Sequence, residues 1–340
     1  MSTLYLSEQN ACVKSRNDYL IVQGVDKRME LPLAKLSQVV VSGNVTLTTP
    51  VMQSLLEAGI TICYLSAQGQ FLGKLVPPLA GDAMVRQKQH RMHDDPRRSM
   101  LVAQACMHGK LHNMCSMLIN WQQASGITEV DEAIAALGAM LHGLQEEQNS
   151  EMLMSIHTNA SEVYREVFGK LLDSAVTGVW HSERAGADCM KVLYNLSNVL
   201  LLQQVTTAIH LAGLDPDIGF LHRMSYRYPA LSLDLMEEFR PLIADDVVLD
   251  VLNRRIIVEQ DVQEERGVVQ LNPTARKTFF LAFEQRLKKQ VQHPHFGYWT
   301  SYRRCIEVQA NLLGKYLAEE TQEYRPFCVE KRRAVKQGEE

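Results

Sequence analysis

Short runs of hydrophobic residues with a high β-strand propensity, broken by polar turn residues, occupy most of the first 80 positions of the chain, which is the pattern of β-strands joined by hairpins. Four strand-like runs, separated by the Asn, Asp and Gly residues typical of turns, lie at 5–6, 11–13, 19–23 and 39–41. An unpaired edge strand such as 39–41 would expose its backbone hydrogen-bonding groups, so we expect it to be paired or covered. Residues 60–65 and 71–75 flank a turn at 66–69 and predict another hairpin. Between these strands, Pro50 opens a helical segment that Gly59 closes.

The spacing of hydrophobic residues changes to that of helices from about Met84 onwards, most clearly at 101–121, 131–144 and 190–213. We therefore predict an α+β fold, in which a β-rich N-terminal domain is followed by a mainly α-helical C-terminal domain. The expected limits are 1–80 for the β-rich domain, 81–95 for a linker with the first basic stretch, 96–325 for the helical domain, and 326–340 for a charged, disordered tail.

The composition excludes several classes of protein. Of the 340 residues, 46% are hydrophobic and 22% are charged, which is ordinary for globular proteins and unlike disordered, collagen-like or coiled-coil chains. No hydrophobic run approaches the roughly 18 residues of a membrane span, and the first twenty residues lack the pattern of a signal peptide. The seven cysteines are scattered without a CxxC pair, so we expect free thiols, a cytoplasmic location and no membrane association.

Positive charge is concentrated locally although the formal net charge is −4. The first basic stretch consists of Arg86, Lys88, Arg91, Arg97 and Arg98. The second contains Arg276, Lys277, Arg286, Lys288, Lys289, Arg303 and Arg304. Aromatic residues are interleaved with the second stretch, and such a mixture suits phosphate contact together with stacking on unpaired bases. A solvated helix face explains each stretch equally well. The segment GQFLGK at 69–74 predicts a turn rather than a phosphate loop, because it lacks the required spacing.

Residues 213–245 carry the most specific chemical signal. His222 follows a Gly-rich turn, while Asp234 and Glu237 are three positions apart, which places both carboxylates on one helix face. An imidazole together with carboxylates can bind a divalent metal ion, and Arg223 and Arg240 lie nearby in sequence, where a phosphate could dock. A helix start explains the same residues without a metal, since acids favour the positive N-terminal dipole and His222 could pack beneath them.

Two strings in this region, GLDPDIGFLH (213–222) and LSLDLMEEFRPLIAD (231–245), resemble the catalytic-domain signature of a CRISPR-associated family. The family is the spacer-acquisition endonuclease and integrase, the first-numbered Cas protein. RQKQHRMHDDPRR (86–98) and NPTARKTFFLAFEQRLKKQVQHP (272–294) resemble other helices of the same family's α domain. The resemblance covers nearly the whole chain and implies a catalytic site in the helical domain.

The family's metal site joins a Glu on an upstream helix, the His of GFLH, and the acid one turn after the Asp of the second string. By this resemblance the second and third ligands are His222 and Glu237, with Asp234 as the adjacent acid. At the first position this chain has His157 instead of Glu, although residues 160–168 keep the spacing of the family's helix. The resemblance thus implies His222, Asp234 and Glu237 as the catalytic residues.

The substitution at His157 changes the expected metal chemistry. An imidazole brings a nitrogen ligand and no negative charge, and a His–His–Glu set suits Mn²⁺ better than Mg²⁺. We expect His157, His222 and Glu237 to lie in one coordination sphere, with Mg²⁺ or Mn²⁺ as the cofactor. The alternative is that His157 is a buried helix residue bonded to a backbone carbonyl. A smaller departure is Lys191, where the family usually has Asn.

The resemblance implies an integrase and metal-dependent DNA endonuclease that inserts short foreign DNA segments into a CRISPR array, with double-stranded and branched DNA as its substrates. It also implies a homodimer through the β domain and a complex with the second-numbered Cas protein. The residues expected to hold the DNA backbone are Arg91, Arg223, Arg240, Arg276, Lys288 and Lys289. Two alternatives stay open: a catalytically degenerate DNA-binding scaffold of the same fold, and an unrelated metal-dependent hydrolase of small phosphoesters.

Overall fold

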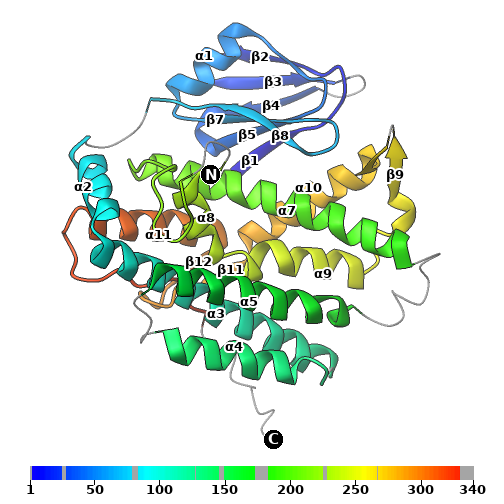
Figure 1. Ribbon diagram of the computed structural model, residues 1–340. Coiled ribbons are helices and arrows are strands. Elements are labelled where there is room, and N and C mark those ends of the chain that lie inside the picture. The colour runs from blue at the N-terminus through cyan, green and yellow to red at the C-terminus, as the bar shows by residue number, and fades with distance from the viewer. Residues whose placement is uncertain are drawn as a thin grey trace, which may run out of the picture.

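The protein is described by a computed structural model that covers residues 2–329 apart from 25–27, 79–82, 127, 145–148, 173–182, 225–227 and 266. A β-rich N-terminal region lies on a larger helical region (Figure 1). The predicted α+β fold is therefore confirmed. None of the described helices is both long and apolar enough to cross a membrane.

Two four-stranded sheets form the N-terminal region. The first has the order β1 (Ser2–Leu6), β5 (Leu36–Ser42), β7 (Thr61–Leu65) and β8 (Phe71–Leu75). Its first three strands are parallel, and β8 pairs antiparallel with β7. The second has the order β4 (Arg28–Pro32), β3 (Tyr19–Gln23), β2 (Cys12–Arg16) and β6 (Thr46–Leu47). The helix α1 (Thr49–Glu57) contributes the buried residues Val51 and Leu55 to the core of this region.

The strand predictions hold with one difference. The hairpin of β7 and β8 is present, and Gly69 in its turn has a φ of 82°, which glycine adopts without strain. Residues 39–41, expected at an edge, lie instead in the central strand β5, whose seven residues are all buried. Val39 and Val41 face the N-terminal core, while Val40 faces the core of the helical region. Strand β5 is hydrophobic on both faces because both are covered.

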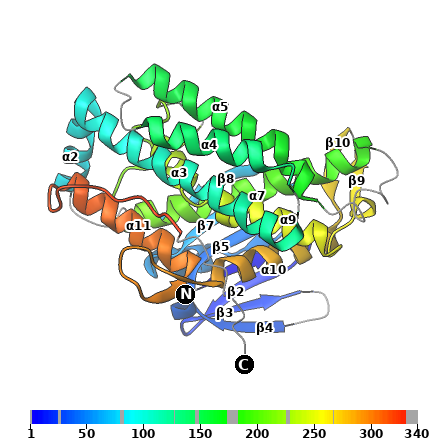
Figure 2. The same cartoon turned by 90° about the horizontal axis from the view of Figure 1, so that it is seen from below.

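Ten helices, given in chain order from α2 onward, form most of the described part of the remaining chain: α2 (Ala83–Asp94), α3 (Pro96–Ser125), α4 (Asp131–Gly143), α5 (Ser150–Phe168), α7 (Glu183–Leu211), α8 (Ala230–Glu237), the π-helix η4 (Pro241–Asp245), α9 (Asp246–Asn253), α10 (Pro273–Lys288) and α11 (Tyr302–Leu317). Two small hairpins interrupt them: β9 (Val262–Glu265) with β10 (Val268–Leu271), and β11 (Gln290–Gln292) with β12 (Trp299–Ser301). Helices α4 and α5 lie along one side of this region and α10 along the other (Figure 2).

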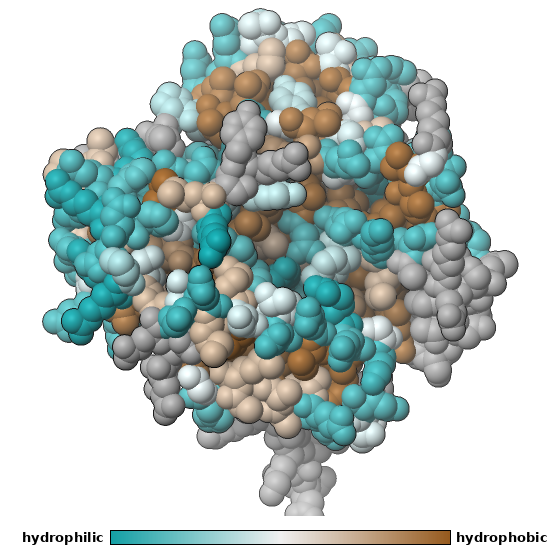
Figure 3. All heavy atoms as spheres, in the orientation of Figure 1, coloured by the Kyte–Doolittle hydropathy of each residue, from teal (hydrophilic) through white to brown (hydrophobic). Residues whose placement is uncertain are grey.

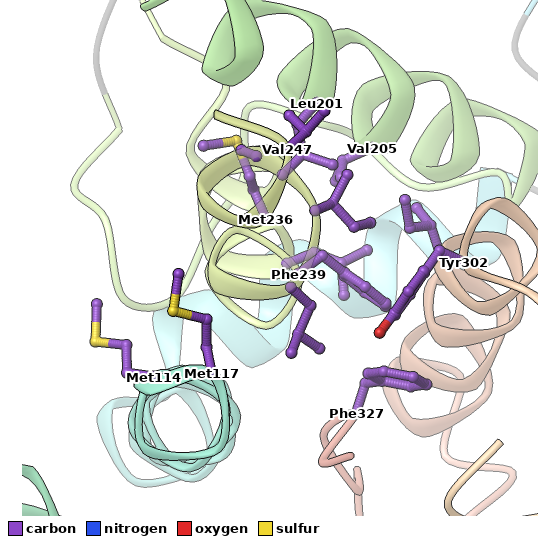
Figure 4. Packing of buried hydrophobic residues seen from close by; sticks show 14 of the residues in the cluster. Met114, Met117, Leu201, Val205, Met236, Phe239, Val247, Tyr302 and Phe327 are labelled. Atoms are coloured by element: carbon purple, nitrogen blue, oxygen red, sulfur yellow. The ribbon is translucent and has the colours of Figure 1, made fainter. Parts of the chain in front are cut away.

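The buried core of the helical region joins α3, α7, α8 and α11. Methionines of α3 and aliphatic residues of α7 surround the segment that carries Phe239 (Figure 4). Phe239 is fully buried, and its ring stacks on Phe327 with 4.9 Å between the centroids. This core fixes the position of α8, which carries two of the candidate site residues.

Two predicted domain limits need correction. The segment 81–95 is not a linker, because it contains α2, where Gln89 is buried and donates hydrogen bonds to the carbonyl oxygens of Asp215 and Ile218. The expected disordered tail does not begin at 326, because Phe327 is fully buried and its amide donates to the Glu238 carboxyl group. A hydrophobic residue with such contacts belongs to the core. Residues 330–340 lie outside the described part of the chain.

Buried contacts join the two regions. Tyr5 of β1 stacks on Phe280 of α10 with 4.9 Å between the ring centroids. Arg303 of α11 donates a hydrogen bond of 2.9 Å to the Thr3 hydroxyl and forms an ion pair of 2.6 Å with Glu284. These contacts hold the first sheet against the helices.

Candidate metal centre

The loop that carries His222 is held by one carboxylate, that of Asp234. A Cβ atom added at Gly219 would lie 2.7 Å from the carbonyl carbon of Ala230, so only glycine allows the loop to approach α8 this closely. The Asp234 carboxylate accepts hydrogen bonds from the backbone N–H groups of residues 220, 221 and 222 at 2.6, 3.1 and 2.9 Å. It also contacts the Nδ1 atom of His222 at 2.8 Å. Asp234 therefore positions the loop and the imidazole together.

The orientation of His222 follows from this contact. A carboxylate only accepts hydrogen bonds, so Nδ1 of His222 carries a proton, and in the neutral imidazole it is Nε2 that has the lone pair. Asp234 is fully buried, and its two oxygens are already occupied by four donors. The geometry thus makes Asp234 an orienting residue and leaves Nε2 of His222 available to a ligand.

His157 lies on α5, which begins where the Asn149 side chain accepts the amides of residues 151 and 152. Ala160, Tyr164 and Phe168 are buried on the inner face of this helix. His157 precedes them by three, seven and eleven positions, so it projects from the same face toward α8. Burial lowers the pKa of His157, and the hydrogen bond to Glu237 opposes this only in part. A neutral imidazole is the form that binds metal ions.

Glu237 is the electrostatic centre of the site and is 3% exposed. Its Oε2 atom lies 3.2 Å from Nζ of Lys110 and also accepts from Arg240, while Oε1 lies 3.3 Å from Nε2 of His157. Burial alone would raise the pKa of Glu237, but Arg240 and Lys110 outweigh it and hold the pKa well below its usual range. The carboxylate is therefore ionised. Lys110 and Arg240 both contact its Oε2 atom, and no lysine or arginine of the described residues contacts Oε1.

The structure brings the three expected ligands together. One ligand atom from each of His157, His222 and Glu237 lies within 4.8 Å of the other two. The two imidazole rings are 5.1 Å apart and nearly perpendicular, with an interplanar angle of 86°. Two neutral imidazoles and one carboxylate fit a transition-metal ion such as Mn²⁺ better than Mg²⁺, which prefers oxygen ligands.

Lys110 is a site residue that our sequence analysis missed. It is fully buried on α3, and besides Glu237 it donates to the Ser161 hydroxyl at 2.7 Å. Burial lowers the pKa of Lys110 to about 8, against the opposing effect of Glu237. One feature of the sequence could have revealed it. Lys110 is the single lysine within the hydrophobic helical pattern of 101–121, and a lysine that is buried in such a helix needs a buried partner of opposite charge.

The six expected DNA contacts divide into three groups. Arg91, Arg223, Lys288 and Lys289 are exposed, and Arg223 lines a cavity of about 360 Å³ beside His222. Arg240 is bound to Glu237 in the site itself. The prediction for Arg276 is wrong, since its side chain is only 5% exposed and cannot reach a phosphate backbone. The second basic stretch is thus partly structural, and Arg286 likewise pairs with Asp246 at 2.6 Å.

Known proteins resemble this chain in sequence and in fold. Residues 4–285 match the family model described as CRISPR associated protein Cas1. The chain is 30% identical over 332 residues to CRISPR-associated endonuclease Cas1 3 of Thermus thermophilus, covering 97% of this chain and 98% of that protein. It is 33% identical over 322 residues to a CRISPR-associated exonuclease Cas4/endonuclease Cas1 fusion of Rhodospirillum rubrum, matching 92% of this chain but spanning only 55% of the fusion.

Two solved structures share the fold. A casposase bound to integration product superposes with a TM-score of 0.83 at 18% identity, covering 98% of this chain and 96% of that chain. A Cas6-RT-Cas1–Cas2 complex contains a chain that superposes with a TM-score of 0.79 at 20% identity, covering 98% of this chain and 36% of that chain. At these identities the likeness shows a common fold.

Proposed function

The chain belongs to the CRISPR-associated Cas1 family, and on that premise we propose that it is an integrase and metal-dependent DNA endonuclease that inserts short DNA segments into a CRISPR array. The observation that carries the proposal is the convergence of His157, His222 and Glu237 from three separate segments onto one point. The folds of the casposase and of the Cas1–Cas2 complex support the integrase assignment.

The three residues would hold one divalent ion, preferably Mn²⁺. Nε2 of His222 is not engaged by the Asp234 contact, which uses Nδ1, and would bind the ion directly. Oε1 of Glu237 and Nε2 of His157 lie 3.3 Å apart in a hydrogen bond, so this pair would exchange that hydrogen bond for the ion. When bound, such an ion polarises the scissile phosphate and activates a 3′-hydroxyl group or a water molecule. Two of the donors are neutral, so the site carries one formal negative charge from its ligands, which weakens the case for Mg²⁺.

The surrounding residues have positioning roles in this proposal. Asp234 keeps Nδ1 of His222 protonated and Nε2 directed away from the loop. Lys110 and Arg240 keep Glu237 ionised and fix its Oε2 atom. In strand transfer, a 3′-hydroxyl oxygen forms a new bond to phosphorus, and the bond from phosphorus to the original 3′ oxygen breaks. The exposed cations Arg91, Arg223 and two lysines of the second stretch would hold the DNA backbone without reading its sequence.

We also propose a homodimer through the β domain and a complex with Cas2. The edge strand β8 exposes Phe71, Leu72 and Leu75, which are 43%, 67% and 37% exposed. A hydrophobic edge strand left uncovered promotes aggregation, so a second copy of this chain would stabilise it. The Cas2 partner is supported by the fold shared with the Cas1-containing complex.

One observation favours a second candidate, a DNA-binding scaffold without catalysis. Lys110 and Arg240 both engage Glu237, and His157 adds no negative charge, so the site attracts a cation less strongly than one with two carboxylates would. A protein of this kind would keep the exposed cations and the fold and lose the reaction.

A strand-transfer assay on branched DNA, run in parallel with Mg²⁺ and Mn²⁺, tests the proposal. We expect product with Mn²⁺, less product with Mg²⁺, and none with either ion for His222→Ala. Absence of product with both ions, while DNA binding persists, would overturn the catalytic proposal in favour of the scaffold.

A further inference from the structure

Two cavities adjoin the metal centre. One of about 490 Å³ opens beside His157 and is lined by three aromatic residues, Tyr164, Phe168 and Tyr194. The other, of about 360 Å³, opens beside His222, and His93 of α2 and the exposed Arg223 also line it. Hydrophilic residues cover most of the side of the molecule on which α2 lies, at the left of Figure 3. Two histidines and an arginine at one cavity suit a sugar–phosphate group of DNA.

His93 is held by a short hydrogen bond to the loop that carries His222. Its Nδ1 atom lies 2.6 Å from the carbonyl oxygen of Gly219, and its ring centroid lies 6.2 Å from that of Phe220. A carbonyl oxygen only accepts hydrogen bonds, so Nδ1 carries a proton and Nε2 is the nitrogen left for another partner. No residue in the described part of the chain forms a hydrogen bond or an ion pair with this Nε2 atom. The loop thus orients His93 as Asp234 orients His222, in each case through Nδ1.

Strand transfer releases a 3′ oxygen that must gain a proton. In enzymes with two metal ions the second ion stabilises this leaving oxygen, but the described residues bring together one set of three ligands. A proton donor of the protein can take this role, and histidine is the side chain that most often does so near neutral pH. A protonated imidazole donates from both nitrogens, so His93 can keep its bond to Gly219 while it offers Nε2–H to the substrate.

We propose that His93 is a further catalytic residue, the general acid that protonates the leaving 3′ oxygen, an inference that rests on the proposed function. The attacking 3′-hydroxyl oxygen forms a bond to phosphorus and loses its proton to water. The bond from phosphorus to the leaving 3′ oxygen breaks, and that oxygen takes the proton from Nε2 of His93. His93 then regains a proton from water, so the numbers of protons and electrons balance.

His93→Asn tests this role while it keeps the contact with the loop. The asparagine N–H group can take the place of Nδ1–H toward Gly219, but nothing replaces Nε2. Strand transfer on branched DNA with Mn²⁺ should slow about 100-fold or more, since general acid–base catalysis typically contributes about 10²- to 10⁴-fold. The affinity for Mn²⁺ by calorimetric titration and the affinity for DNA by fluorescence anisotropy should stay unchanged. His90→Asn, at an exposed histidine of the same helix, should leave all three quantities unchanged.

A sulfur substrate separates proton donation from a structural role. Branched DNA is prepared with sulfur in place of the bridging 3′ oxygen of the scissile phosphate, because a thiolate leaves without a proton far more readily than an alkoxide does. We expect His93→Asn to react with this substrate at the rate of the unaltered protein. A residue that only holds the loop would slow both substrates alike, and that result would overturn the proposal.

Two further results would overturn it. One is an unchanged rate of His93→Asn with the oxygen substrate, and the other is loss of Mn²⁺ binding, which would make His93 a support of the metal centre. If circular dichroism shows that His93→Asn is not folded, His93→Gln is compared in the same way. Absence of strand transfer by the unaltered protein would reject the proposed function and this role with it, whereas an active protein that does not need His93 would reject this role alone.

Discussion

Replacing Asp234 with alanine should damage both the stability of the protein and its metal centre. The substitution removes the acceptor of three backbone N–H groups, at residues 220–222, and of Nδ1–H of His222. Each buried donor left without a partner costs about 1–3 kcal/mol. Because water can enter the space that the carboxylate vacates, we take the lower end of the summed range for four donors, about 4–12 kcal/mol, and expect a loss of about 4–5 kcal/mol.

Asp234→Asn separates the two roles of this carboxylate. Asparagine keeps one acceptor oxygen but turns an NH₂ group toward a backbone donor, so we expect a smaller loss of about 1–3 kcal/mol. Its weaker hold on His222 should lower the affinity for Mn²⁺ by about 10- to 100-fold, as is usual when the partner of a metal-binding imidazole is altered. Urea unfolding followed by circular dichroism measures the first effect, and calorimetric titration with Mn²⁺ measures the second.

Asp250→Ala is the matched control, because Asp250 is partly exposed on α9 and makes a surface ion pair with Arg254. Its stability should change by no more than about 0.5 kcal/mol. A loss below about 1 kcal/mol for Asp234→Ala would refute the hydrogen-bond reasoning. If Asp234→Asn loses Mn²⁺ binding as completely as His222→Ala does, then Asp234 is itself a metal ligand.

Further predictions address the metal, the DNA and the pH dependence. His157→Glu should raise the rate of strand transfer with Mg²⁺ relative to the rate with Mn²⁺, because the substitution adds a charged oxygen ligand. An unchanged ratio of the two rates would contradict this. Lys288→Glu with Lys289→Glu should weaken DNA binding alike for all sequences and flatten its dependence on salt; anisotropy measured at several salt concentrations checks this. His293 is fully buried, and burial together with His295 lowers its pKa to about 4. Between about pH 6.5 and pH 4 the unfolded chain therefore binds a proton that the folded protein does not, so stability should fall as the pH falls through this window, by up to about 3 kcal/mol. His293→Gln should flatten the thermal midpoint across this pH range, whereas His142→Gln, at an exposed position, should leave the dependence unchanged. The homodimer predicts twice the monomer mass by light scattering at micromolar concentration, and a monomer would count against it.

The local parts of the fold could be predicted from the sequence because local rules govern them. The turn at Gly69, the start of α1 near Pro50 and the strand β3 depend on residues within a few positions of one another. The resemblance to the family's helix implied that His157 faces the site, and helical spacing places it on the side of the buried residues Ala160 and Tyr164.

Contacts between distant segments could not be predicted in this way. Nothing near Lys110 in sequence shows that it meets Glu237, 127 positions later, or that Arg276 turns inward while its neighbours Lys277 and Lys288 stay exposed. Each of these depends on which helix packs beside which.

For this protein, the sequence by itself determined the α+β class, because β-rich runs and helical spacing are local patterns, and its resemblance to a known family indicated three candidate ligands. Only the tertiary structure decided that Asp234 orients His222 rather than lying free, that Lys110 and Arg240 pair with the ionised Glu237, and that an aromatic cavity adjoins His157. The physical reason is that burial and charge pairing depend on distances through space, and packing sets these distances only once the whole chain has folded.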